Sequence, residues 1–106
     1  MKKIEKILII IQRSNGDVFL SFSLIKALQK NYELAKIDLL VNDDTLAVAK
    51  LIPKIESIIT FSYQRKKDEK LKQEFEIITR IYRKYDLSIN LTASDRSVMY
   101  AILASK

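Results

Sequence analysis

Segments with two different patterns of hydrophobic and polar residues alternate along this chain. One pattern is typical of buried strands, and the other is typical of amphipathic helices. Residues 6–12, KILIIIQ, form a continuous apolar, largely β-branched run, which is characteristic of a strand covered on both faces of a parallel sheet. From Asp17 to a stop near Asn31, apolar residues recur every three or four positions, which predicts a helix. The apolar positions of this helix are Val18, Phe22, Ile25 and Leu28.

The rest of the chain repeats this alternation. Strands are predicted at 36–41 (KIDLLV), 57–61 (SIITF) and 86–91 (DLSINL). Between and after them we expect a short helix capped by NDD and closed by Pro53, a helix that follows the charged run 64–72, and a helix capped by Ser94 or Asp95. The apolar positions of these three helices are Leu46, Ala49 and Ile52, then Leu71, Phe75, Ile78, Ile81 and Tyr82, and finally Val98, Met99, Ile102 and Leu103.

Strands that alternate with helices predict repeated βαβ units with right-handed crossovers. We therefore expect an α/β, Rossmann-like parallel sheet of about four strands in the order 3-2-1-4, with helices on both faces. Residues 1–106 form a single domain in this interpretation. Because both edges of a four-stranded sheet need protection, we also expect the chain to be the front part of something longer.

The amino-acid composition excludes several kinds of metal site and catalytic site. The chain has 106 residues, 48% of them hydrophobic, which is enough for one small domain with a buried core. It has no cysteine and no histidine. That excludes a disulfide framework, a zinc site with Cys or His ligands, and any Ser-His-Asp or Cys-His catalytic arrangement. Proton transfer would fall to carboxylates, lysines or tyrosines.

The charge balance favours anionic partners. Nineteen lysines and arginines against 13 acidic residues give a net charge of +6, which suits phosphorylated sugars, nucleotides, nucleic acid or an acidic lipid surface. A well-solvated basic surface is the plain alternative. No nucleic-acid-binding motif is present, so we expect no nucleic-acid partner. The opening apolar run is too short for an export signal, and we expect a cytoplasmic protein.

The first candidate site is the loop after the first strand, residues 12–16. It contains Gly16, the single glycine of the chain, followed directly by Asp17. Ligands of open parallel sheets bind beyond the carboxyl ends of the strands, and a glycine there allows a sharp bend and the close approach of another molecule. Asp17 would lie in the first helical turn, where the helix dipole favours an ionised carboxylate. The alternative is that Asp17 is only an N-cap.

The second candidate site is NLTASDRS, residues 90–97, after the last strand. Its hydroxyl and amide side chains can hydrogen-bond sugar hydroxyls, and Arg96 can hold a carboxylate or phosphate in a bidentate manner. The alternative is a capping cluster with Asp95 and Arg96 in solvent. In a sheet ordered 3-2-1-4 the first and last strands are neighbours, so both loops would border one crevice. The hydrogen-bonding side chains are Asn90, Thr92, Ser94 and Ser97.

These residues resemble the amino-terminal half of glycosyltransferase family 9, the ADP-heptose:lipopolysaccharide heptosyltransferases. The family pattern K-I-L-I-I-R-x-D-N-I-G-D-V-L-L-T-T-P-L-I-R-A-L corresponds to KILIIIQRSNGDVFLSFSLIKAL here. The family's K-I-D-x-L-V and Y-D-x-x-I-D-L-T-x-S-x-R-S correspond to KIDLLV and YDLSINLTASDRS. The chain departs from the pattern at Ile11 in place of arginine, at residues 21–23 in place of T-T-P, and at Asn90 in place of an acid.

The resemblance implies the amino-terminal part of a GT-B fold, in which two Rossmann-like domains face a cleft. By this match the chain is the acceptor-side domain, and the donor-binding second domain is absent. The family transfers heptose, or a related sugar, from a nucleotide-sugar to a lipopolysaccharide core acceptor with inversion. It uses neither metal nor cofactor, and the matching Asp17 acts as general base. The residues implied in acceptor binding are Arg13, Ser14, Asn15, Gly16, Thr92, Ser94, Asp95, Arg96 and Ser97.

The same resemblance implies an anionic glycolipid or core-sugar acceptor and peripheral contact with the inner membrane. The nucleotide-sugar donor would bind only through the second domain, so the isolated chain is expected to be inactive. The alternative function is a non-catalytic α/β binding module that has kept the fold. A phosphoacceptor receiver domain is excluded, because that chemistry requires an aspartate at the end of the third strand, which here ends FSY.

Overall fold

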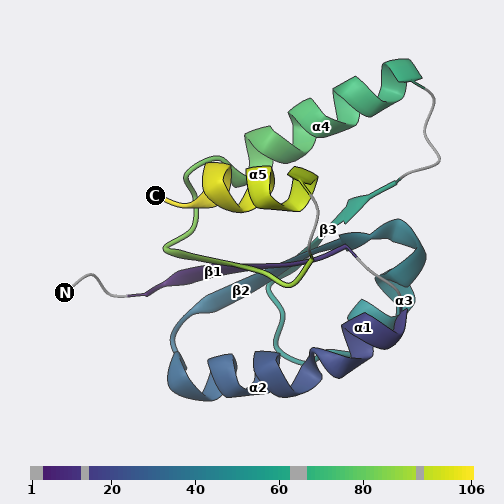
Figure 1. The fold of residues 1–106 in the computed structure, drawn as a ribbon. Coiled ribbons are helices and arrows are strands. Elements are labelled where there is room, and N and C mark those ends of the chain that lie inside the picture. The colour runs from purple at the N-terminus through teal and green to yellow at the C-terminus, as the bar shows by residue number, and fades with distance from the viewer. Residues whose placement is uncertain (1–3, 13–14, 63–66, 93–94) are drawn as a thin grey trace.

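Ten elements make up the part of the chain that the structure describes (Figure 1). The computed structural model describes residues 4–12, 15–62, 67–92 and 95–106. The strands are β1 (Lys6–Ile11), β2 (Lys36–Asn42), β3 (Ser57–Phe61) and β4 (Leu87–Asn90). The helices are α1 (Asn15–Leu20), α2 (Phe22–Asn31), the 3₁₀ turn η1 (Asp43–Thr45), α3 (Leu46–Ala49), α4 (Lys67–Ile81) and α5 (Asp95–Ala104).

The four strands form one parallel sheet in the order β3-β2-β1-β4, which confirms the predicted fold class and strand order. Ile7 of β1 lies beside Ile37 of β2 and Leu87 of β4, and this register continues along the strands. The side chains of β1 from Ile7 onward are buried, as a strand covered on both faces requires. The edge strand β4 is half-buried throughout.

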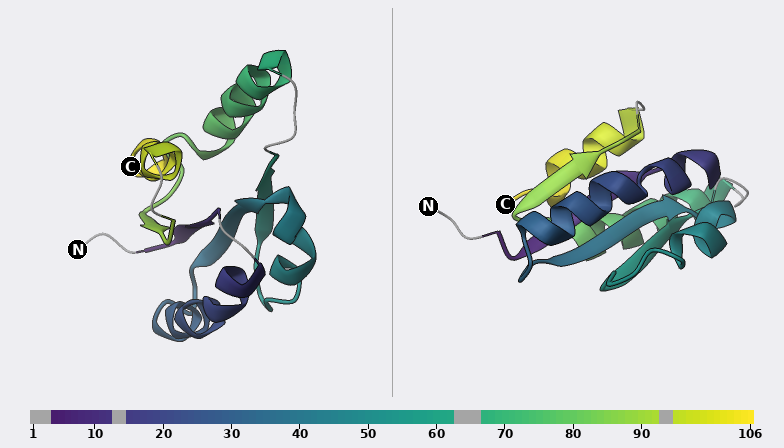
Figure 2. Two further views of the ribbon diagram at one scale, coloured as in Figure 1. Left: turned by 45° about the vertical axis from the view of Figure 1, so that its right-hand side comes forward. Right: turned by 90° about the horizontal axis from the view of Figure 1, so that it is seen from below.

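Helices cover both faces of the sheet (Figure 2). Residues Ile7, Ile9 and Ile11 of β1 belong to the core beneath α1, α2 and α3, where Val18 and Ile25 also lie. Alternate residues of a strand point to opposite faces. Leu8 and Ile10 therefore belong to a second core beneath α4 and α5, whose helical members are Ile77, Ile81, Tyr100 and Ala104.

The first helix of the chain differs from the prediction because it is interrupted at Ser21, which separates α1 from α2. The Ser21 hydroxyl donates to the Val18 carbonyl at 2.5 Å, an alternative to the regular helical ladder that serine side chains offer. The helix after β2 is also shorter than predicted. It begins with η1 and ends at Ala49, before Ile52 and Pro53.

The buried faces of α4 and α5 differ from the predicted ones. Ile81 is buried as predicted, but Leu71 and Phe75 are each 74% exposed, because the buried side of α4 carries Gln73, Ile77 and Ile81 at intervals of four residues. Figure 1 shows α4 on the same side of the sheet as α5. On α5 the expected apolar side chains Val98, Met99 and Ile102 are exposed. The buried side chains of α5 are Ser97, Tyr100 and Ala104, and the small ones allow the helix to approach the sheet closely.

A polar side chain attaches α4 to the end of β3. Gln73 is buried, its Oε1 accepts from the Ser62 backbone N at 2.8 Å, and its Nε2 donates to the Ser62 carbonyl at 3.0 Å. One side-chain amide thus supplies both hydrogen bonds that a neighbouring strand would supply at this position.

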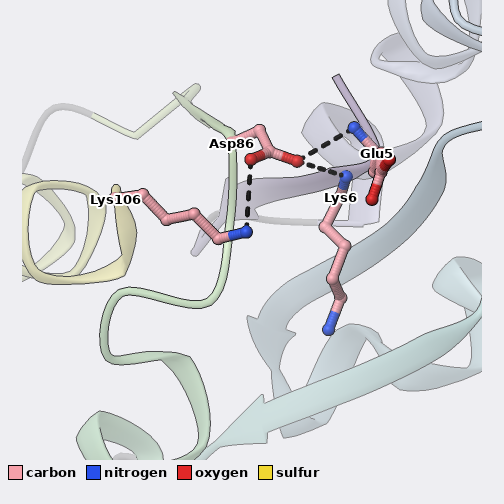
Figure 3. A network of polar contacts seen from close by, with 4 residues as sticks. All are labelled: Glu5, Lys6, Asp86 and Lys106. Atoms are coloured by element: carbon pink, nitrogen blue, oxygen red, sulfur yellow. Dashed lines mark hydrogen bonds and ion pairs between the residues drawn. The ribbon is translucent and has the colours of Figure 1, made fainter. Parts of the chain in front are cut away.

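At the amino-terminal edge of the sheet, Asp86 joins β4 to β1 (Figure 3). One carboxylate oxygen, Oδ2, accepts from the backbone N of Glu5 at 2.9 Å and of Lys6 at 3.0 Å, and Oδ1 pairs with Lys106 Nζ at 3.3 Å. The backbone hydrogen bonds, then Lys106, hold the pKa of Asp86 below its ordinary value. Among the described residues, no helix has the length and apolar character needed to span a bilayer.

Candidate functional site

The loops that follow β1 and β4 meet at the carboxyl edge of the sheet, as the sequence predicted. The Leu91 backbone N donates to the Ile10 carbonyl at 2.9 Å, which continues the pairing of the two strands. One residue further, the Gln12 backbone N donates to Thr92 Oγ1 at 2.6 Å. Both residues are buried. The hydroxyl of Thr92 therefore fastens the start of one polar loop to the start of the other.

Further hydrogen bonds fix the loop after β4. Asn90 Oδ1 accepts from the Thr92 backbone N at 2.9 Å, and Ser97 Oγ donates to the Thr92 carbonyl at 2.8 Å. Ser97 is fully buried at the start of α5. The structure thus uses Thr92 and Ser97 to set the position of this loop relative to β1. Their direct contact with an acceptor stays a prediction.

Asp17 is the third residue of α1 and is half-buried, and Gly16 before it is exposed. Asp17 lies in the first helical turn, as predicted, and not at an N-cap. One expectation changes: Gly16 belongs to the helix without a positive φ, so the glycine is not needed for a sharp bend. What Gly16 still offers is the absence of a Cβ, which allows a ligand to approach the backbone beside Asp17.

Several predicted site residues lie outside the described part of the chain. Arg13, Ser14 and Ser94 belong to the gaps at 13–14 and 93–94. Backbones are described, and side chains are not, for three residues in the first turns of α1 and α5, namely Asn15, Asp95 and Arg96. The meeting of Asp17 and Arg96 in one crevice therefore stays a prediction. Among the described residues, no group of three acidic side chains is placed to hold a metal ion.

Sequence reasoning missed two buried amides at the same edge. Gln12 directly follows β1 and is 6% exposed, and Asn42 ends β2 and is 9% exposed. The β1–β2 register ends with Ile11 beside Val41, and Gln12 and Asn42 directly follow these two residues. Gln12 Nε2 and Oε1 and Asn42 Oδ1 have no hydrogen-bond partner among the described residues. An amide directly after a buried strand was the available signal, because such a position forces a polar group into the core boundary.

A hollow at the opposite, amino-terminal edge is a competing location. It encloses about 420 Å³ and is lined by a mixture of acids and lysines with one leucine. Asp38, one of its lining residues, accepts through Oδ2 from the Tyr85 hydroxyl at 2.6 Å, and burial, then this contact with Asp38, raises the pKa of Tyr85. Ligands of open parallel sheets bind at the carboxyl edge, so the edge with Asp17 is the stronger candidate. The lining residues are Glu5, Lys6, Leu34, Lys36, Asp38 and Glu56.

Comparison with known proteins supports the fold described above. No family model matches the chain. It is 37% identical over 83 residues to lipopolysaccharide heptosyltransferase 3 of Escherichia coli, which covers 76% of this chain and 24% of that protein. The chain thus spans about a quarter of the length of this curated relative.

Solved structures match nearly the whole chain. A glycosyl transferase family 9 protein from Veillonella parvula DSM 2008 superposes with a TM-score of 0.81 at 20% identity over 97% of this chain and 30% of that one. The Escherichia coli heptosyltransferase WaaC with ADP gives 0.77 at 16% identity, over 94% and 33%. Escherichia coli ADP-heptose lipopolysaccharide heptosyltransferase II gives 0.70 at 25% identity, over 93% and 28%. The first two similarities, at low identity, establish the fold.

Proposed function

We propose that this chain is the acceptor-side part of a sugar transferase. The proposal rests on its relationship to the lipopolysaccharide heptosyltransferases of glycosyltransferase family 9, of which it matches a part the size of an amino-terminal domain. In this proposal it receives a lipopolysaccharide core acceptor. A second, donor-binding domain presents a nucleotide-sugar such as ADP-heptose. The reaction takes place on the cytoplasmic side of the inner membrane.

One observation carries the proposal. The Gln12–Thr92 hydrogen bond of 2.6 Å fixes the two polar loops at one edge of the sheet, and α1 places Asp17 three residues into the helix that leaves the first loop. A carboxylate at the carboxyl edge of a parallel sheet is located where ligands of such sheets bind. This arrangement supports the assignment of a base and a polar binding surface to the same edge.

In the proposed mechanism Asp17 accepts the proton of an acceptor hydroxyl while that oxygen attacks the anomeric carbon of the donor sugar. The bond between the anomeric carbon and the phosphate oxygen breaks, the nucleoside diphosphate leaves, and the configuration inverts. A positioned general base of this kind contributes roughly 10² to 10⁴ in rate. Arg96, with Ser94 and the loop of Arg13 to Gly16, would hold the charged groups of the acceptor.

Acceptor binding can be tested on the 106-residue chain. In a ¹⁵N NMR titration with a phosphorylated core oligosaccharide, we expect the largest amide shifts at Gly16, Asp17 and Thr92. Amides near Asp86, at the opposite edge, serve as the internal control. Shifts confined to the amino-terminal edge would place the ligand in the other hollow and contradict the proposal.

The role of Asp17 requires a donor-binding domain. We suggest a chimera in which this chain replaces the matching segment of lipopolysaccharide heptosyltransferase 3. With Asp17→Asn we expect transfer to fall by about 10² to 10⁴-fold. The matched control is Asp43→Asn, an exposed acid in η1, which should retain full transfer. Equal activity of the two variants would remove Asp17 as the base.

A second candidate function is a non-catalytic α/β binding module. The observation in its favour is that the hydroxyls of Thr92 and Ser97 serve the fold itself, through bonds to Gln12 N and the Thr92 carbonyl. Acceptor-induced NMR shifts, together with a chimera that folds and does not transfer sugar, would support this function over the first.

A further inference from the structure

Two buried amide side chains at the carboxyl edge of the sheet have polar atoms without a hydrogen-bond partner in the described part of the chain. They belong to Gln12, which directly follows β1, and to Asn42, which ends β2. The atoms are Gln12 Nε2 and Oε1 and Asn42 Oδ1. Such atoms are rare in native proteins, because burial removes their bonds to water and nothing replaces them. Where a fold keeps them at a ligand-binding edge, a group of the ligand is the natural partner.

The alternation of side chains along the strands directs both amides to the same face of the sheet. Leu40 of β2 belongs to the core beneath α4 and α5, and Asn42 follows it by two residues. Ile10 of β1 belongs to the same core, and Gln12 follows it by two residues. The register pairs Ile10 with Leu40. Because adjacent strands lie only about 4.8 Å apart, one sugar ring is large enough to contact both amides.

The chemistry of the three atoms indicates what kind of group they bind. Gln12 Nε2 is a donor, whereas Gln12 Oε1 and Asn42 Oδ1 are acceptors. An ionised phosphate or carboxylate has only acceptor oxygens, so it would leave both carbonyl oxygens unpaired. An ammonium group has only donors, so it would leave Nε2 unpaired. A hydroxyl donates and accepts, and two hydroxyls satisfy all three atoms.

We propose that Gln12 and Asn42 form a neutral subsite that binds two hydroxyls of the acceptor sugar. This inference rests on the proposed function, which locates the acceptor at the edge that carries Asp17. The Gln12 backbone N is bonded to Thr92 Oγ1, so the subsite adjoins the junction of the two polar loops. The subsite divides recognition of the acceptor between two kinds of residue. Arg96 holds its charged groups, and the two amides select its hydroxyls.

A binding role for the Gln12 amide differs from a structural role in its effect on the free protein. Replacing Gln12 by methionine keeps the length of the side chain and removes both unpaired amide atoms. The free chain should therefore be as stable as wild type or more stable, whereas acceptor binding should weaken. If the amide served the fold, through a buried water molecule or a bond to Asn42, the same substitution would lower the stability.

The test measures stability and acceptor affinity of Gln12→Met in the 106-residue chain. Urea unfolding gives the stability of the free chain, and NMR titration with the phosphorylated core oligosaccharide gives the affinity at low and at high salt. We expect an unchanged or raised urea midpoint and an affinity about two- to tenfold lower than that of wild type. The factor should be the same at both salt concentrations, because these hydrogen bonds join uncharged groups.

Two further variants complete the experiment. The matched control is Gln29→Met in α2, on the opposite face of the sheet, where Gln29 Nε2 donates to the Pro53 carbonyl at 2.7 Å. This variant should bind the oligosaccharide like wild type, and its stability should not rise. Asn42→Leu is an independent second variant, because the Asn42 side chain makes no cap bond to η1. It should weaken binding without lowering the urea midpoint.

Three results would overturn the subsite and leave the proposed function standing, provided that the wild-type chain shows acceptor-induced shifts at Gly16 and Asp17. The first is equal affinity of wild type and Gln12→Met. The second is a clear fall in the urea midpoint of Gln12→Met, which would assign the amide to an internal partner. The third is a loss of affinity that disappears at high salt, which would mean that the amides bind a charged group. Absence of all shifts in the wild-type chain would overturn both proposals.

Discussion

Replacing Thr92 by valine would remove one oxygen from the junction of the two polar loops and leave the shape of the side chain almost unchanged. Thr92 Oγ1 accepts from the Gln12 backbone N at 2.6 Å, and both residues are buried. Valine cannot accept this hydrogen bond. The Gln12 N–H would then be buried without its partner, and the first loop would lose its attachment to the second.

The expected magnitude follows from the cost of a buried, unpaired backbone donor, which is about 1–3 kcal/mol. For a domain of this size each kcal/mol corresponds to a fall in Tm of roughly 4–8 °C. Thr92→Ser keeps the hydroxyl and loses only the methyl group, so its loss of stability should be clearly smaller. The difference between the two variants isolates the hydrogen bond.

The assay is urea unfolding followed by far-ultraviolet circular dichroism, with thermal unfolding as a second measurement. A free energy of unfolding for Thr92→Val within about 0.5 kcal/mol of wild type, the range of an ordinary surface change, would refute the reasoning. An equal loss in Thr92→Ser would refute it as well, because that variant retains the acceptor oxygen. In the NMR titration, Thr92→Val should also weaken acceptor binding through the altered loop position.

Two further predictions address the other edge and the second core. The lowered pKa of Asp86 contributes stability above its ordinary pKa, about 3.9, that is lost as the pH falls toward the native pKa. The difference in free energy of unfolding between wild type and Asp86→Asn should therefore be constant above about pH 5 and shrink below pH 4; a pH-independent difference in urea titrations would contradict this. Ile81→Ala should lower the free energy of unfolding by about 2–5 kcal/mol, and Leu71→Ala should lower it by less than about 0.5 kcal/mol. If calorimetry gives similar losses of stability for these two variants, the buried face of α4 is misassigned.

The strands could be predicted well because their signal is local. β3 has the predicted bounds, and β1 and β2 differ from the predicted strands by one residue each. Runs such as KILIII combine β-branched side chains with the absence of polar residues, and both properties act within the strand itself. The strand order followed from βαβ alternation and the right-handedness of crossovers, which hold for almost all parallel sheets.

The helix faces could not be predicted as well. A periodic apolar pattern shows that a helix has an apolar side, but α4 has two adjacent ones, and only its position over the sheet selects Ile77 and Ile81 for burial. On α5 the close approach to the sheet selects Ser97 and Ala104 over larger side chains. Such choices depend on contacts between segments far apart in the sequence.

The candidate site, like the helices, could be predicted from the sequence only in part. Sequence spacing located Asp17 after the first strand and the hydroxyl-rich segment after the fourth, and resemblance to a family gave them roles. The conformation of Gly16 and the burial of Gln12 and Asn42 came from the structure. An amide directly after a buried strand is a local signal, but whether it is enclosed is decided by groups that belong to other elements.

The sequence by itself determined the layered parallel sheet and the edge where polar loops gather, because hydrophobic periodicity and chain handedness operate over neighbouring residues. Only the tertiary structure decided which hydroxyls are consumed in joining those loops and which apolar side chains of α4 and α5 stay outside the core. These outcomes depend on how closely each helix packs against the sheet, and that distance is fixed by the whole set of side chains between them.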